Sequence, residues 1–229
     1  MKAVIFAGGR GTRLRPLTND RPKPMVEVAG KPIIEWQITW LRHYGIKELL
    51  MLGSHMLNVM HDYVGDGSKW GASVEYIDEG SPKGTAGALY GAKDMLKNDD
   101  GFFLINGDLL TDFDPKKAIK HEYLTTITLF PFRSPYGIVH LDGSSITKFE
   151  EKPLIQGHWI NSGIVYTKQG IFNYLPKKGD ISIETFPRLA AEGKLGGVKD
   201  TAYNKMIDAI KDVDEATADI EKGIFKPLD

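Results

Sequence analysis

Glycine and cationic residues gather near the start of the chain, in an order suited to holding phosphate groups. A short apolar run, Lys2–Phe6, is followed by A-G-G-R-G-T-R over residues 7–13, and Lys23 lies further along. Glycines leave backbone N–H groups uncovered, and Thr12, Arg13 and Lys23 add donors to an anion. These residue types predict a cradle for a polyphosphate.

Two common phosphate-binding loops do not match this segment. The dinucleotide fingerprint G-x-G-x-x-G, begun at Gly9, requires a third glycine where Leu14 stands, and no acidic residue is evident at the expected distance for a ribose. The P-loop needs Gly-Lys-Ser/Thr, which occurs nowhere in the chain. An incidental glycine turn is the remaining alternative, and it would need neither Arg13 nor Lys23.

The whole segment resembles the signature of the sugar-1-phosphate nucleotidyltransferases. It contains A-G-G-x-G-T-R-L-x-P-L-T over residues 7–18 and R-P-K-P over 21–24. Members of this family make nucleotide-sugars from a nucleoside triphosphate and a sugar 1-phosphate. The resemblance implies that Arg13 and Lys23 are catalytic, and that the loop residues binding the nucleotide are Ala7, Gly8, Gly9, Gly11, Thr12 and Arg13.

Two aspartates follow apolar runs that predict buried strands. Asp108 ends Asn106-Gly107-Asp108 after residues 101–105, and Asp208 follows Met206-Ile207. Carboxylates at strand ends suit Mg2+, which completes its shell with water and phosphate oxygens. For Asp108 an ordinary N-G-D turn is the alternative.

The resemblance implies that Asp108 and Asp208 are the metal ligands. The late motif departs from the family pattern, because Met206 stands where tryptophan is usual. The other candidates in that segment are Asp212 and Asp214.

The segment from Glu79 to Gly87 concerns the nucleotide base. Thr85 suits the N-cap of a following helix, so a capped helix after a turn is the simplest interpretation. The resemblance implies that Glu79, Gly84 and Thr85 bind the nucleotide, with Glu79 where uridylyl and thymidylyl members usually have glutamine. A carboxylate accepts both N1–H and the amine of guanine, whereas uracil and thymine offer one N3–H. GTP is therefore favoured over UTP, dTTP or CTP, with a solvated turn carboxylate as the alternative for Glu79.

Three later motifs resemble the sugar side of the family: Y-G at 136–137, E-K-P at 151–153 and N-x-G at 161–163. Each alone has a simpler interpretation as a turn or a strand-end charge. Lys152 supplies the cation that an acceptor phosphate needs, and Glu184 resembles another acidic position near the sugar. The sugar-phosphate-binding residues implied by the resemblance are Asn106, Gly137, Glu151, Lys152, Asn161 and Gly163.

The expected reaction is direct in-line attack of the sugar phosphate on the α-phosphorus, because no Ser-His or Cys-His pattern is evident. Arg13 and the loop would bind the β- and γ-phosphates, Lys23 the reacting phosphate, and Mg2+ the bridging oxygens. Glu79 with the following G-T-A-G resembles the guanylyltransferase branch that makes GDP-mannose or GDP-heptose, so mannose 1-phosphate or a similar sugar 1-phosphate is the expected acceptor. Uridylyl or thymidylyl transfer to glucose 1-phosphate or another sugar 1-phosphate is an alternative. A regulatory subunit that binds nucleotide-sugars without making them is the alternative from another class, although the full set of charged residues favours an enzyme.

Composition limits the partners. The chain has 229 residues, 29 basic and 30 acidic, and a net charge of -1, so no global field attracts nucleic acid or an anionic membrane. It has no cysteine, which excludes disulfides and thiolate metal sites. No signal-type or membrane-spanning apolar stretch is evident, so we expect a cytoplasmic location. Because the resemblance covers nearly all of the sequence, we expect no C-terminal left-handed β-helix of the kind that many relatives carry. The oligomeric state is left open, with a homo-oligomer as one alternative.

Alternating strands and helices must position these residues. We expect an α/β, Rossmann-like three-layer αβα fold with a mixed, mostly parallel central sheet, in a single domain over residues 1–229. Asp142-Gly143 predicts a hairpin in a small β meander on the sugar side. The strands are expected at 2–6, 48–52, 73–77, 101–105, 125–132, 137–141, 146–150, 163–167 and 206–209, and the helices at 31–44, 58–64, 85–96, 183–192 and 214–222.

Overall fold

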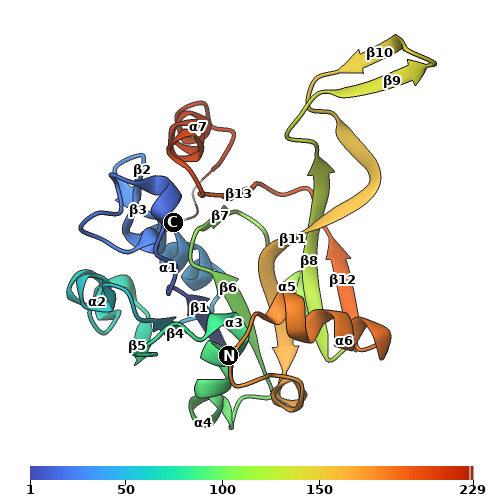
Figure 1. Cartoon of the computed structure of the whole chain (residues 1–229). Helices are drawn as coiled ribbons and strands as arrows, with labels where there is room; N and C mark the ends of the chain where they lie inside the picture. The colour runs from blue at the N-terminus through green and yellow to red at the C-terminus, as the bar shows by residue number, and fades with distance from the viewer. Residues whose placement is uncertain (227, 229) are drawn as a thin grey trace.

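The centre of the protein is a seven-stranded mixed sheet, shown by the computed structural model, which describes residues 1–226 and 228 (Figure 1). The strand order is β12-β8-β11-β6-β1-β4-β5, and β11 is antiparallel to both of its neighbours. The mixed, mostly parallel sheet is therefore confirmed. Its strands are β1 Lys2–Phe6, β4 Glu48–Gly53, β5 Ser73–Asp78, β6 Gly101–Asn106, β8 Thr125–Arg133, β11 Leu154–Lys168 and β12 Leu195–Lys199.

Helices cover both faces of this sheet, because its central strands are apolar on both sides. On one face, Ile5 and Phe103 share a core with Ile38 of α1. On the other, Val4 and Phe102 share a core with helices α3 and α6. The three-layer arrangement is thus confirmed. The helices are α1 Ile33–His43, α2 Leu57–Val64 and α5 Lys116–Ile119 on the first side, and α3 Gly84–Gly91, α4 Lys93–Leu96 and α6 Phe186–Ala191 on the second.

A third, smaller core joins the two ends of the chain. Leu14 and Val28 from the N-terminal segment pack with Ile207 and with Ala216 of α7 (Ile210–Glu221). The short strand β13 (Asn204–Met206) pairs antiparallel with β7 (Leu109–Thr111), which follows β6 directly. This packing brings the segment after β13 to the carboxyl end of the central sheet. The remaining short strands are β2 Glu27–Val28 and β3 Lys31–Pro32.

A two-stranded arm projects from the body of the protein (Figure 1). It consists of β9 (Ile138–Asp142) and β10 (Ser145–Glu150), which pair antiparallel. Gly143 has a φ of 58°, which explains why the turn needs glycine. The hairpin expected from Asp142-Gly143 is confirmed.

Several predicted boundaries are wrong. The helix expected over 85–96 is divided into α3 and α4, and the one expected over 183–192 begins with a π-helical turn, Ile181–Thr185. The last strand ends at Met206, and α7 begins at Ile210 because Asp212 accepts hydrogen bonds from the N–H groups of Asp208 and Ala209. In the described part of the chain, no helix has the length and apolar character needed to span a bilayer.

Candidate active site

Three adjoining cavities lie at the carboxyl ends of β1 and β6, and Phe6 lines all three. The first, about 240 Å³, is lined by the glycine loop and its charged partners. The second, about 330 Å³, extends from the loop to α3, and the third, about 270 Å³, extends to β11 and residues 180–183. We name them, after the ligands that the sequence leads us to expect, the phosphate, nucleoside and acceptor cavities.

Two glycines shape the phosphate cavity. Gly11 has a φ of 58°, and a Cβ there would lie 2.9 Å from Cγ2 of Thr18. At Gly107 a Cβ would lie 2.5 Å from the carbonyl oxygen of Phe6. Because Gly107 lacks one, its N–H donates to that carbonyl at 3.0 Å, which holds Asp108 close to the loop. The glycine of N-G-D therefore serves close packing against β1.

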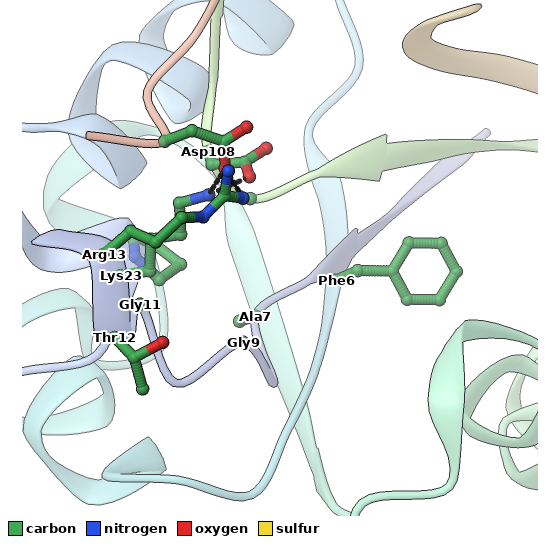
Figure 2. A pocket seen from close by; sticks show the side chains of 11 residues that line it. Phe6, Ala7, Gly9, Gly11, Thr12, Arg13, Lys23 and Asp108 are labelled. Atoms are coloured by element: carbon green, nitrogen blue, oxygen red, sulfur yellow. Dashed lines mark hydrogen bonds and ion pairs between the residues drawn. The ribbon is translucent and has the colours of Figure 1, made fainter. Parts of the chain in front are cut away.

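Figure 2 shows the side chains of Arg13 and Lys23 pointing toward Asp108. Nζ of Lys23 donates to Oδ2 of Asp108 and, at 2.6 Å, to Oδ1 of Asp208. Nη2 of Arg13 donates to the same Oδ1 at 3.0 Å. Burial opposes ionisation of Asp208, but the hydrogen bond from Lys23 and the charges of Lys23 and Arg13 outweigh it and lower its pKa. Both carboxylates thus accept hydrogen bonds from the ammonium group of Lys23.

The residues of this cluster fit Mg2+. Oδ1 of Asp108 is buried and has no hydrogen-bond partner among the described residues, so one carboxylate oxygen remains available. The Lys23 ammonium between the two carboxylates shows that the place accepts a cation. Among the described residues no group of three or more His, Cys, Asp or Glu could hold a metal ion.

The sequence offers three acidic residues as the second metal ligand, namely Asp208, Asp212 and Asp214, and tertiary packing places Asp208 beside Asp108. The N–H of Ile207 donates to the carbonyl of Asp108 at 2.9 Å, which brings Asp208 beside Asp108. The carboxylate of Asp212 instead accepts hydrogen bonds from backbone N–H groups at the start of α7. Asp214 lines a separate cavity with Arg21. Only Asp208 of these three contacts Lys23 in the described structure.

Glu79 lies in the nucleoside cavity, across from the glycine loop. A Cβ on Gly8 would lie 3.3 Å from Oε1 of Glu79, so the carboxylate sits against the loop backbone. Burial raises the pKa of Glu79 above its usual value, although the backbone N–H and the charge of Lys83 oppose this change. The arrangement places an acceptor where a base could enter.

The prediction that Thr85 is an N-cap is wrong. Helix α3 begins at Gly84, and its N-cap is Lys83. The hydroxyl of Thr85 is instead engaged by a distant segment: it accepts from the N–H of Ile181 at 3.0 Å and lies 3.3 Å from Oδ1 of Asp180. Gly84 has a φ of 73°, and a Cβ there would lie 2.3 Å from the carbonyl oxygen of Gly179. Gly84 therefore makes room for another part of the chain as well as lining the cavity.

The acceptor cavity joins Asn106, Asn161 and Gly163. Gly163 has a φ of 79°, and a Cβ there would lie 2.8 Å from Nδ2 of Asn106. The N–H of Gly163 donates to Oδ1 of Asn161 at 3.0 Å. Asp180 lines both this cavity and the nucleoside cavity, and no local motif in the sequence marks it as a site residue.

The other predicted sugar-phosphate residues lie at the base of the arm. A Cβ on Gly137 would meet the Phe149 ring at 2.5 Å and Oε2 of Glu151 at 3.1 Å. Nζ of Lys152 lies 4.0 Å from Oε1 of Glu151. Gly137, Glu151 and Lys152 are absent from the residues lining the three cavities. The structure therefore groups the predicted acceptor residues into two sets.

Comparisons with known proteins agree with this architecture. The family model described as nucleotidyl transferase matches residues 2–203. A probable mannose-1-phosphate guanylyltransferase of Oryza sativa subsp. japonica is 36% identical over 85% of this chain and 58% of its own length. A mannose-1-phosphate guanylyltransferase of Mycobacterium tuberculosis is 31% identical over 97% of this chain and 65% of its own length. The chain thus spans less than two thirds of these relatives.

A UTP–glucose-1-phosphate uridylyltransferase of Synechocystis is also 31% identical, over 84% of this chain and 56% of its own length. Among solved structures, HddC from Yersinia pseudotuberculosis is 27% identical with a TM-score of 0.77, covering 96% of this chain and 99% of that one. A second HddC structure, complexed with GMP-PN, has a TM-score of 0.76 with the same coverage and identity.

Proposed function

The chain belongs to the nucleotidyl transferase family, and we propose that it transfers the guanylyl group of GTP to a sugar 1-phosphate, with mannose 1-phosphate as the expected acceptor. The observation that carries this proposal is the meeting of Arg13, Lys23, Asp108 and Asp208 beside the glycine loop. All four line the phosphate cavity, Asp108 also lines the nucleoside cavity, and Phe6 lines both of these and the acceptor cavity. The site can therefore hold a triphosphate next to a second phosphorylated ligand.

Glu79 supports the choice of GTP. Its carboxylate only accepts hydrogen bonds, and guanine presents two adjacent donors. The named activity of the rice and mycobacterial relatives supports the same choice. UTP is the second candidate nucleotide, because the Synechocystis relative is named as a uridylyltransferase at comparable identity.

The proposed reaction is a single displacement. An oxygen of the sugar phosphate forms a bond to the α-phosphorus while the bond from that phosphorus to the bridging oxygen breaks, and pyrophosphate leaves. No protein nucleophile is required, so the residues act by positioning and charge. Arg13 and the loop N–H groups bind the β- and γ-phosphates. Lys23 leaves its carboxylate partners to contact the reacting phosphate.

Asp108 and Asp208 would hold Mg2+, which supplies positive charge to phosphate oxygens. Asn106 and Asn161 bind hydroxyls of the sugar from the acceptor cavity. Lys152 is proposed to contact the acceptor phosphate. Because Lys152 lies outside the three cavities, this contact requires the base of the arm to move toward the acceptor cavity.

A substrate matrix tests this function. Pyrophosphate release is measured for GTP, UTP, dTTP and CTP against mannose, glucose, heptose and N-acetylhexosamine 1-phosphates. Fastest turnover with GTP and mannose 1-phosphate supports the proposal, and Glu79→Gln is expected to lower the preference for GTP over UTP. Undiminished GTP preference in Glu79→Gln would remove the base-reading role, and no release with any pair would favour a non-catalytic binder.

A further inference from the structure

The first turn of α3 is packed directly against residues 177–183, which we call the strap. The N–H of Gly179 donates to the carbonyl of Lys83 at 2.8 Å, and the N–H of Ala86 donates to the carbonyl of Gly179 at 2.9 Å. A Cβ on Gly87 would lie 2.7 Å from the carbonyl oxygen of Lys177. Glycine thus allows the strap backbone to contact the helix backbone.

Thr85 and Asp180 fasten this contact. Oδ1 of Asp180 accepts from the N–H of Thr85 at 3.2 Å and lies 3.3 Å from its hydroxyl oxygen. That hydroxyl also accepts from the N–H of Ile181 at 3.0 Å, so it can donate to Asp180 and accept from Ile181 together. The N–H groups of Thr85 and Ala86 belong to the helix start, where no acceptor exists within the helix. The strap therefore caps α3 in place of a local side chain.

Asp180 also fixes the backbone that follows it. Its carbonyl accepts from the N–H of Ile183 at 3.1 Å and from that of Glu184 at 2.8 Å. These bonds form the start of the π-helical turn Ile181–Thr185. Such turns are rare in proteins overall and are found disproportionately at functional sites. Ile181 is buried, whereas Ile183 is 70% exposed and lines the acceptor cavity. The position of this wall depends on the contact between the strap and α3.

Thr85 and Asp180 both line the nucleoside cavity and the acceptor cavity. We propose that they are positioning residues, whose mutual hydrogen bonds hold the acceptor-side wall 181–183 in place from the helix that borders the nucleoside cavity. This inference rests on the proposed function, in which the acceptor cavity binds the sugar phosphate. Removing either partner then weakens acceptor binding through displacement of the wall 181–183.

The test compares Thr85→Val, which keeps the branched shape but removes the hydroxyl, with Asp180→Ala and the double variant. Each single variant is expected to raise KM for the sugar phosphate by about tenfold, as for the loss of one or two hydrogen bonds, and to raise it more than KM for GTP. The double variant is expected to raise KM by less than the product of the two single effects, because both single variants remove the hydrogen bond between the Thr85 hydroxyl and Asp180. Thr85→Ser and Asp180→Asn, which keep the hydroxyl and the acceptor, should recover most of the acceptor affinity.

Hydrogen exchange of amides 181–185 gives a readout that needs no turnover. Faster exchange is expected in Thr85→Val and Asp180→Ala, and not in Thr85→Ser. A raised acceptor KM in Asp180→Ala alone would indicate direct contact with the sugar and overturn the proposal, as would unchanged KM in both. If the wild-type protein uses no substrate pair, the proposed function fails, and unchanged exchange in both variants then overturns the positioning role separately.

Discussion

Replacing Lys23 by methionine is expected to tighten binding of Mg2+ to the nucleotide-free protein while it lowers turnover. In the structure the Lys23 ammonium contacts both proposed metal ligands, Asp108 and Asp208. A cation at these carboxylates must therefore displace Lys23 and also approach its charge. Methionine keeps most of the side-chain volume and removes both obstacles.

The magnitude follows from the charges and their exposure. Two unit charges about 4 Å apart interact by about 1 kcal/mol in bulk water and about 4 kcal/mol at an effective dielectric constant of about 20. The Lys23 side chain is 12% exposed and that of Asp208 is 38% exposed, so the cluster lies between these limits. We therefore expect Mg2+ affinity to rise at least about tenfold, which corresponds to about 1.4 kcal/mol.

Calorimetric titration with Mg2+, and Mn2+ titration followed by electron paramagnetic resonance, measure this affinity without substrate. Lys117→Met is the matched control, because Lys117 forms a 2.6 Å ion pair with Asp200 outside the three cavities and its loss changes net charge equally. Unchanged or weaker metal binding in Lys23→Met would refute the idea that Lys23 occupies the cation position. An equal increase in Mg2+ affinity in Lys117→Met would show that the effect comes from net charge alone.

Three further outcomes are expected. Asp108→Asn should lower turnover strongly with the melting temperature retained, and near-normal pyrophosphate release would remove its assignment as a metal ligand. KM for GTP should rise as pH falls through the pKa of Glu79, because protonation removes a hydrogen-bond acceptor for the base. Burial raises that pKa, so the rise in KM begins at a higher pH than it would for an exposed glutamate. Glu79→Gln should abolish this pH dependence of KM. Gly107→Ala should lower the free energy of unfolding by roughly 1–3 kcal/mol in urea titrations, because its Cβ would overlap the carbonyl of Phe6. Gly91→Ala is the control and should not lower it, because no heavy atom lies near the added Cβ. Equal stabilities of the two variants would contradict the close-packing role of Gly107.

Local signals predicted the elements that depend on nearby residues. The apolar run Lys2–Phe6 forms a central strand because it is buried on both faces, and Asp142-Gly143 forms the hairpin turn because glycine accepts a positive φ. The prediction for Thr85 was wrong for the opposite reason. Its hydroxyl suits a local cap, but residues about a hundred positions away, Asp180 and Ile181, use it instead.

The order of residue types along the chain establishes which chemistry is available: a glycine loop with Arg13 and Lys23, and acidic residues after apolar runs. Which of those carboxylates contact the cations depends on how distant segments pack together. Pairing of β7 with β13 and the small core around Ile207 bring Asp208 to Lys23, and leave Asp212 to begin α7. Residue types fix what a side chain can donate or accept, whereas its distance from a group far away in the chain depends on how strands pair and helices pack.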